Sequence, residues 1–164
     1  QRQMCIRDSH NPYPAWAIAS GFRFVAANRA AEKLFPGMIQ LDPMTLIDMW
    51  CGPNSPHSEA MRQKSIGQIL TVLRHELLHY PHPDLPALLS RVESYSSGLK
   101  IQLESPDSPI LCGEMPVGEQ VARTIATIMR FDKAIDITIA ELRVELVFPA
   151  DEESAAILQD YFNS

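Results

Sequence analysis

The sequence has few of the residues that mark disulfide-bonded, zinc-binding or nucleotide-binding proteins. Its 164 residues contain three cysteines, Cys5, Cys51 and Cys112, and no two of them form a CxxC pair. We therefore expect free thiols in a reducing compartment, not a disulfide framework or a zinc site. The seven glycines form neither a GxGxxG nor a Walker phosphate-binding loop, so we expect no nucleotide cofactor.

Positive charge and long apolar runs are also scarce. The chain has 14 Lys and Arg residues against 20 Asp and Glu residues, a net charge of -6. This balance offers no basic surface for a phosphate backbone, so we do not expect this segment to bind nucleic acid itself. No apolar run approaches the roughly 20 residues of a membrane span, and no signal peptide is visible. At 46% apolar residues, the chain suits one globular domain in the cytoplasm.

The first nine residues differ from the rest of the chain. They show no hydrophobic periodicity, do not begin with Met, and resemble the peptide produced when a sequencing adapter is translated. We expect residues 1–9 to be non-native and residues 10–164 to form the domain. On this interpretation the gene is truncated, and whatever preceded His10 is missing.

Near the C-terminus, alternating side chains predict a β-hairpin. Between residues 140 and 148, one set is apolar and the other charged: Leu142, Val144, Leu146 and Phe148 against Glu141, Arg143 and Glu145. This period of two predicts a strand with a buried apolar face and a solvent-exposed charged face. A β-branched and apolar run over residues 120–131 predicts its partner strand, and residues 132–136 predict a short loop between them.

The start of the domain predicts two strands and a short helix. Residues 15–20 and 22–26 are short apolar runs separated by Ser20-Gly21, and Asn28 can cap a helix over residues 29–34. Further helices are expected over 44–50, 58–79 and from 85, capped by Asp42 and Asp84, and at the C-terminus after Asp151. A weak strand candidate lies at 101–103, and a third main strand at 110–117 turns at Gly118-Glu119. The order predicts an α+β, PAS-like fold with about five antiparallel strands and helices covering one face.

Motifs at both ends give the chain a specific resemblance. They are 11–15 (Asn-Pro-Tyr-Pro-Ala), 26–31 (Ala-Ala-Asn-Arg-Ala-Ala), 34–35 (Leu-Phe), 123–131, 136–138, 141–145 and 148–151. In this order they resemble the MmyB-like ligand-binding domain over about residues 11 to 162. Between residues 38 and 108 the match is one of helical character.

The resemblance implies a function in transcription regulation. In that family the domain is the C-terminal, PAS-like sensor of XRE-family helix-turn-helix regulators, and members are associated with fatty-acid-like ligands. It implies an apolar small molecule as partner, a homodimer, and DNA binding through a domain upstream. No catalysis, cofactor, metal or membrane partner is implied.

The resemblance also implies a ligand pocket, although core packing explains most aromatic and Met positions equally well. The expected contacts are Trp16, Phe24, Met49, Leu73, Ile125, Met129, Leu142, Val144 and Arg123. The carboxylate of a fatty acid needs a cationic partner, for which Arg123, Arg130 and Arg143 are candidates. A five-residue hairpin loop would place Leu142 and Val144 opposite Ala126 and Thr124, and a shift of one would bring Ile125 and Arg123 there instead.

Two other functions compete with this interpretation. His75, Glu76 and His79 match the HExxH pattern of zinc hydrolases. Helical geometry places both histidines nearly opposite the apolar stripe of residues 66, 69, 70, 73 and 77, which favours two surface histidines. A pure dimerisation domain with a filled core is the other alternative.

Glu141 and Glu145 could be paired catalytic carboxylates, but Arg143 between them favours a solvated, salt-linked surface.

Overall fold

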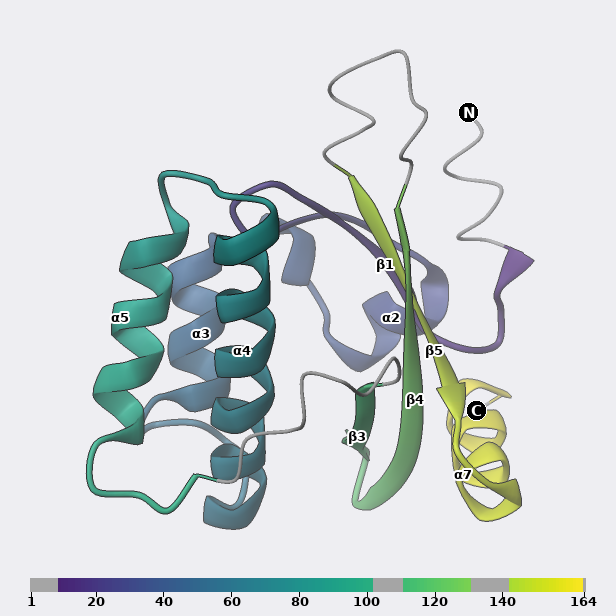
Figure 1. Ribbon diagram of the computed structural model, residues 1–164. Coiled ribbons are helices and arrows are strands. Elements are labelled where there is room, and N and C mark those ends of the chain that lie inside the picture. Colours follow the sequence, from purple (N-terminus) through teal and green to yellow (C-terminus); the bar gives the residue numbers. More distant parts are fainter. Residues whose placement is uncertain (1–8, 102–110, 131–141, 164) are drawn as a thin grey trace. The chain divides into compact units, whose positions relative to one another are not determined.

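The computed structural model describes residues 9–101, 111–130 and 142–163 (Figure 1). The chain divides into two compact units, which are described separately below. The first contains residues 1–19, 24–40 and 110–164 and carries the β-sheet. The second contains residues 20–23 and 41–109 and is helical. Among the described residues, no helix is long and apolar enough to cross a membrane.

An antiparallel sheet of five strands organises the first unit, as the sequence predicts. In spatial order the strands are β2 (Arg23–Ala27), β1 (Ala15–Ala19), β5 (Arg143–Pro149), β4 (Gln120–Arg130) and β3 (Leu111–Val117). The turn between β3 and β4 falls at Gly118, whose φ of 60° is a conformation that glycine adopts without steric cost. The C-terminal strand β5 thus lies in the middle of the sheet, beside the N-terminal strand β1.

Asn28 joins β1 to the short helix α2 (Arg29–Leu34). Its side-chain Oδ1 accepts hydrogen bonds from the backbone N–H of Ala15, at 3.1 Å, and of Ala31, at 2.9 Å. Its Nδ2 donates to the carbonyl of Tyr13 at 2.8 Å. The predicted helix cap is confirmed, and the same side chain also fixes the entry to β1. A 3-10 turn, η1 (Met38–Gln40), follows α2.

The last helix, α7 (Glu152–Asn163), packs against β3, β4 and β5. The carboxylate of Asp151 accepts a hydrogen bond of 2.8 Å from the backbone N–H of Ser154, so the predicted cap is confirmed. At the other end, the Nζ of Lys33 donates to the carbonyl of Tyr161 at 2.7 Å. Helix α7 therefore connects the sheet to α2.

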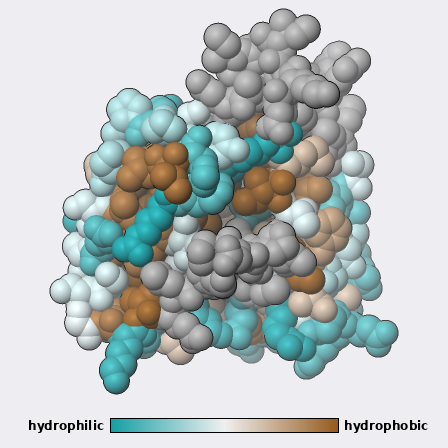
Figure 2. Space-filling model, viewed as in Figure 1, coloured by the Kyte–Doolittle hydropathy of each residue, from teal (hydrophilic) through white to brown (hydrophobic). Residues whose placement is uncertain are grey.

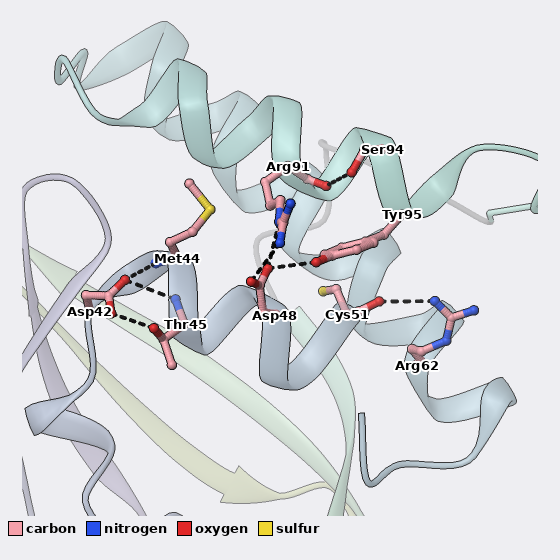
Figure 3. A network of polar contacts seen from close by, with 9 residues as sticks. All are labelled: Asp42, Met44, Thr45, Asp48, Cys51, Arg62, Arg91, Ser94 and Tyr95. Carbon is pink, nitrogen blue, oxygen red and sulfur yellow. Dashed lines mark hydrogen bonds and ion pairs between the residues drawn. The ribbon is translucent and has the colours of Figure 1, made fainter. Parts of the chain in front are cut away.

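The described part of the second unit contains three helices, α3 (Pro43–Cys51), α4 (Glu59–His79) and α5 (Leu85–Ser96), which contact one another (Figure 1). The predicted stripe of α4 is its buried side, where Ile66 and Leu73 are fully buried. Asp42 caps α3 by accepting hydrogen bonds of 3.0 Å from the N–H groups of Met44 and Thr45, as expected (Figure 3). The element boundaries follow from caps and apolar periodicity that are legible in the sequence.

Two local expectations were wrong. Asp84 occupies the cap position of α5 but has helical dihedral angles, φ -80° and ψ -23°, and its side chain makes no capping hydrogen bond. A cap needs an extended backbone to place its oxygen over the first turn. The hairpin register also differs from both predicted ones, because Val144 pairs with Met129 and Thr124 pairs with Pro149.

Parts of the predicted hairpin and the weak strand lie outside the described residues. These are the loop at 132–136, most of the candidate strand at 101–103, and the first residues of the final strand.

Candidate functional site

The register of the sheet gathers charged and aromatic side chains on one face. In the antiparallel pair of β1 and β5, Trp16 lies opposite Glu145 and Ile18 lies opposite Arg143. Directly opposed residues of such a pair point to the same side of the sheet. These four residues therefore share one side, which we call the Trp16 face.

The charged residues of the Trp16 face are largely enclosed by protein. Arg143 is 3% exposed, and Glu145 is half-buried. The indole Nε1–H of Trp16 donates a hydrogen bond of 2.9 Å to Oε2 of Glu145. Burial raises the pKa of Glu145, while the hydrogen bond from Trp16 and the positive charge of Arg143 oppose that rise. The face thus holds a carboxyl and a guanidinium that interact electrostatically.

The prediction that the charged face of the final strand is solvent-exposed was wrong. The alternation predicted solvated Arg143 and Glu145 with Phe148 inside, yet Arg143 is buried and Phe148 is 37% exposed. Both faces of β5 are covered by protein, because Val144 on one face is 2% exposed and Arg143 on the other is 3% exposed. Alternating polarity therefore did not reveal which side faces solvent. Glu141, the third charged residue of the pattern, lies outside the described residues.

Aromatic rings pack around Trp16. Its ring centroid lies 6.1 Å from that of Phe24 and 6.3 Å from that of Phe35. Trp16 and Phe24, both expected to contact ligand, are buried and adjacent. The analysis of the sequence did not include Phe35 among the contacts, although it belongs to the Leu34-Phe35 motif of the resemblance.

Several of the other expected contacts lie on the opposite side of the sheet. Val144 alternates with the Trp16-face residues of β5 and pairs with Met129. It forms a buried cluster with Ala17 and Leu142. Ile125, four positions before Met129 on β4, points to the same side as Met129. The structure therefore does not bring this group together with Trp16.

The two expected contacts in the second unit differ in burial. Leu73 is fully buried in α4, whereas Met49 is only partly buried in α3.

The three candidate arginines have different surroundings. The side chain of Arg123 is 69% exposed and forms an ion pair with Asp151 at the start of α7. Arg130 is partly buried and lies opposite Arg143 in the pairing of β4 with β5. Arg143 is the one most enclosed by protein, and a guanidinium in that setting needs an anionic partner more than an exposed one does.

The HExxH residues lie near the end of α4. His75 and His79 are both exposed, with ring centroids 4.5 Å apart, and Glu76 is half-buried. Within residues 9–101, 111–130 and 142–163, no group of three or more His, Cys, Asp or Glu residues could hold a metal ion. The position on an exposed helix face agrees with the interpretation as surface histidines.

Large apolar side chains are also exposed near the end of α4. Leu78 is 76% exposed and Tyr80 is 46% exposed. Figure 2 shows hydrophobic side chains, in brown, lying between hydrophilic ones on one view of the molecule. Scattered apolar residues are normal on protein surfaces, so they do not by themselves identify a binding site.

Comparison with known families gives one finding. The family model for the MmyB-like transcription regulator ligand binding domain matches residues 6–160. Neither the curated proteins nor the solved structures compared with the chain provide a match. The matched range includes the residues of the Trp16 face.

Proposed function

The chain belongs to the MmyB-like transcription regulator ligand binding domain family, and from this premise we propose that it binds a fatty-acid-like molecule on the Trp16 face. The proposal assigns the carboxylate of the ligand to the guanidinium of Arg143. It assigns the start of the alkyl chain to the rings of Trp16, Phe24 and Phe35.

The enclosed guanidinium of Arg143 is the observation that carries this proposal. At 3% exposure it has lost most of its contact with water, so a carboxylate that binds it gains a charge-assisted, two-point hydrogen bond. Arg123, the arginine favoured from the sequence, is a weaker candidate because its side chain is 69% exposed and water screens its charge. An alkyl chain adds roughly 0.8 kcal/mol for each methylene that it buries, so few further polar contacts are needed.

We further propose that the domain works within a cytoplasmic helix-turn-helix regulator of the XRE family and forms a homodimer. The net charge of -6 supports a division of labour in which another domain contacts DNA. Ligand binding can change the affinity for DNA only as far as the ligand binds one state of the regulator more tightly than the other. Light scattering after size exclusion, with and without ligand, tests the dimer.

The ligand proposal is tested by titrating the purified chain with dodecanoate in a calorimeter. We compare wild type with Arg143→Gln and with Arg123→Gln, the exposed control. Arg143→Gln should weaken binding by about ten- to a hundredfold, because a hydrogen bond to a charged group contributes about 1.5–3 kcal/mol. Arg123→Gln should leave the affinity nearly unchanged.

Circular dichroism establishes first that each variant is folded. No binding of dodecanoate, decanoate or hexadecanoate to folded wild type would refute the fatty-acid proposal. Equal losses in the two variants would refute the assignment of Arg143.

A further inference from the structure

His75 and His79 lie on one side of the last turn of α4, four positions apart. Residues with this spacing are neighbours on the surface of an α-helix. The backbone N–H of Tyr80 donates to the carbonyl of Glu76 at 2.7 Å, so a helical hydrogen bond closes the turn that carries both histidines. The proposed fatty-acid site uses neither of them.

The two imidazole rings have the spacing of a chelate. Their centroids are 4.5 Å apart, and the ring planes are tilted by 44°. Imidazole nitrogens lie about 2.0–2.1 Å from a bound zinc ion, so two rings about 90–110° apart around the metal have centroids about 4.5–5 Å apart. Because His75 and His79 are both exposed, a cation can reach them from solvent.

The charges beside the pair permit a cation to bind. Arg74, which precedes His75, forms an ion pair of 3.0 Å with Glu93 of α5, and this carboxylate offsets its positive charge. Glu76, half-buried in the same turn, is acidic. The ring of Tyr80 lies 6.4 Å from each histidine ring and adds no charge.

We propose that His75 and His79 form a binding site for a divalent transition-metal cation of the zinc, nickel and copper class. Imidazole suits these metals, whereas magnesium and calcium prefer oxygen ligands. The two imidazoles occupy two coordination positions, and water occupies the others. The site binds the cation and is not assigned the hydrolysis that the HExxH pattern suggests.

Metal binding at this site stabilises the end of α4. The two rings converge only while residues 75–79 are helical, because an extended backbone separates side chains four positions apart by about 13 Å. The cation therefore binds the folded chain more tightly than the unfolded one and stabilises it by linkage. The helical unit thus carries an inorganic ligand of its own.

The test measures Cu²⁺ binding by equilibrium dialysis and electron paramagnetic resonance at about pH 7.5, because ligation needs neutral imidazole. Cu²⁺ is the probe because a nitrogen site holds it most tightly among these metals. The parent protein is the full chain with Cys5→Ser and Cys112→Ser, which removes two competing thiols. The third thiol, that of Cys51, is buried.

Four variants are compared with this parent. His75→Ala and His79→Ala each remove one ligand, and His57→Ala, the matched control, removes a half-buried histidine that precedes α4. The double variant Arg74→His, His75→Ala keeps the number of histidines but sets the two five positions apart, about 140° around the helix. It also removes a positive charge beside the site, so a loss of affinity comes from the spacing.

We expect the parent to bind one Cu²⁺ through two nitrogen ligands, with no competition from Mg²⁺ in about hundredfold excess. His75→Ala, His79→Ala and the double variant should bind at least tenfold more weakly, because losing a group that only orients a ligand already costs about ten- to a hundredfold. His57→Ala should leave the affinity unchanged. Unchanged affinity in the double variant, or an equal loss in His57→Ala, would overturn the proposal.

Thermal unfolding gives a second measurement. Zn²⁺ should raise the unfolding midpoint of the parent but not that of His79→Ala, and equal shifts in both would overturn the site.

Circular dichroism establishes first that each variant is folded. If a histidine variant does not fold, the resonance spectrum of the parent decides alone: two bound nitrogens support the site, and fewer overturn it. No Cu²⁺ binding by the folded parent would also overturn it. Because the site shares no residue with the Trp16 face, none of these results changes the test of the fatty-acid proposal.

Discussion

The guanidinium of Arg91 in α5 binds the carboxylate of Asp48 in α3 through two hydrogen bonds, 2.8 Å from Nε to Oδ1 and 2.9 Å from Nη2 to Oδ2 (Figure 3). The hydroxyl of Tyr95 donates to the same Oδ1 at 2.8 Å. The guanidinium also lies 5.2 Å from the centre of the Tyr95 ring. A charged network on the surface thus connects two helices of the second unit, in addition to the apolar contacts between them.

A double-mutant cycle should measure this connection. Asp48→Asn, Arg91→Gln and the double variant are unfolded in urea at neutral pH. We expect a coupling energy that is measurable but small, because water screens a pair this exposed even when it is bidentate. As a control, the exposed pair of Arg74 and Glu93, joined by a hydrogen bond of 3.0 Å from Nη2 to Oε1, should couple less strongly. Equal coupling in both pairs would contradict a special role of the bidentate geometry.

The contribution of Asp48 should disappear in acid. The hydrogen bond from Arg91, the largest effect, holds the pKa of Asp48 below its usual value. A carboxyl whose pKa is lower in the folded than in the unfolded state stabilises the fold above the unfolded pKa. That stabilisation is lost as pH falls through the folded pKa. The stability difference between wild type and Asp48→Asn should therefore be constant above about pH 5 and shrink as pH falls below that value, through the unfolded pKa of an aspartate; a difference that stays constant in acid would contradict this.

Asn28→Ala should cost more stability than the matched cap variant Asp42→Ala. Asn28 is 1% exposed, and its loss leaves the N–H of Ala15 and the carbonyl of Tyr13 without these partners. We expect Asn28→Ala to cost about 2–4 kcal/mol, and Asp42→Ala, at an exposed cap, to cost clearly less. Urea unfolding measures both, and Asn28→Asp tests the cap oxygen separately from the amide donor. Similar losses at residues 28 and 42 would show that only the cap matters.

Gly21→Ala should destabilise the chain more than Gly37→Ala. Both glycines have positive φ, 73° and 74°, so both variants incur the same backbone cost, about 1–2 kcal/mol. An added Cβ at Gly21 would also lie 2.8 Å from Nδ1 of His82, whereas none of the atoms described lies within 4 Å at Gly37. The free energies of unfolding of the two variants, measured in urea, should differ by about 1 kcal/mol.

His82→Ala in the Gly21→Ala background removes the overlapping ring. It should recover most of that difference, and failure to recover it would assign the cost to the backbone.

Cys51 should resist thiol reagents in the folded chain. It is fully buried in α3, and burial raises the pKa of its thiol to about 12. Because the thiolate is the reactive form, labelling at about pH 8 should require unfolding. A variant with Cys5→Ser and Cys112→Ser, which keeps Cys51, should react slowly in buffer and fast in urea. Fast labelling in buffer would show that this part of the second unit opens readily.

Much of the secondary structure is local and therefore predictable. Asn28 and Asp42 were recognised as caps because a short polar side chain before an apolar-periodic segment satisfies the first N–H groups of a helix. Asp84 has the same type of sequence context, yet its backbone is helical and its side chain does not cap. A cap depends on dihedral angles as well as residue type, and neighbouring packing sets those angles.

The candidate site was less predictable, because it depends on which strands are neighbours. The period of two in β5 showed which residues share a side, but not which side is enclosed. Pairing with β1 places Trp16 opposite Glu145, although 129 positions separate the two in sequence. No local sequence pattern spans so many residues. A shift of one residue in the strand pairing would also have placed each of these side chains on the other face of the sheet.

The sequence by itself determined most of the local elements, the caps of α2, α3 and α7, the α+β order and the family, because each depends on neighbouring residues or short motifs. Only the tertiary structure decided that Arg143 and Glu145 are enclosed and that Arg123 is exposed. The physical reason is that burial is a property of non-local packing. From the sequence alone, a charged residue on a strand can lie in solvent or in the interior. Its neighbours in the folded structure decide which of the two it is.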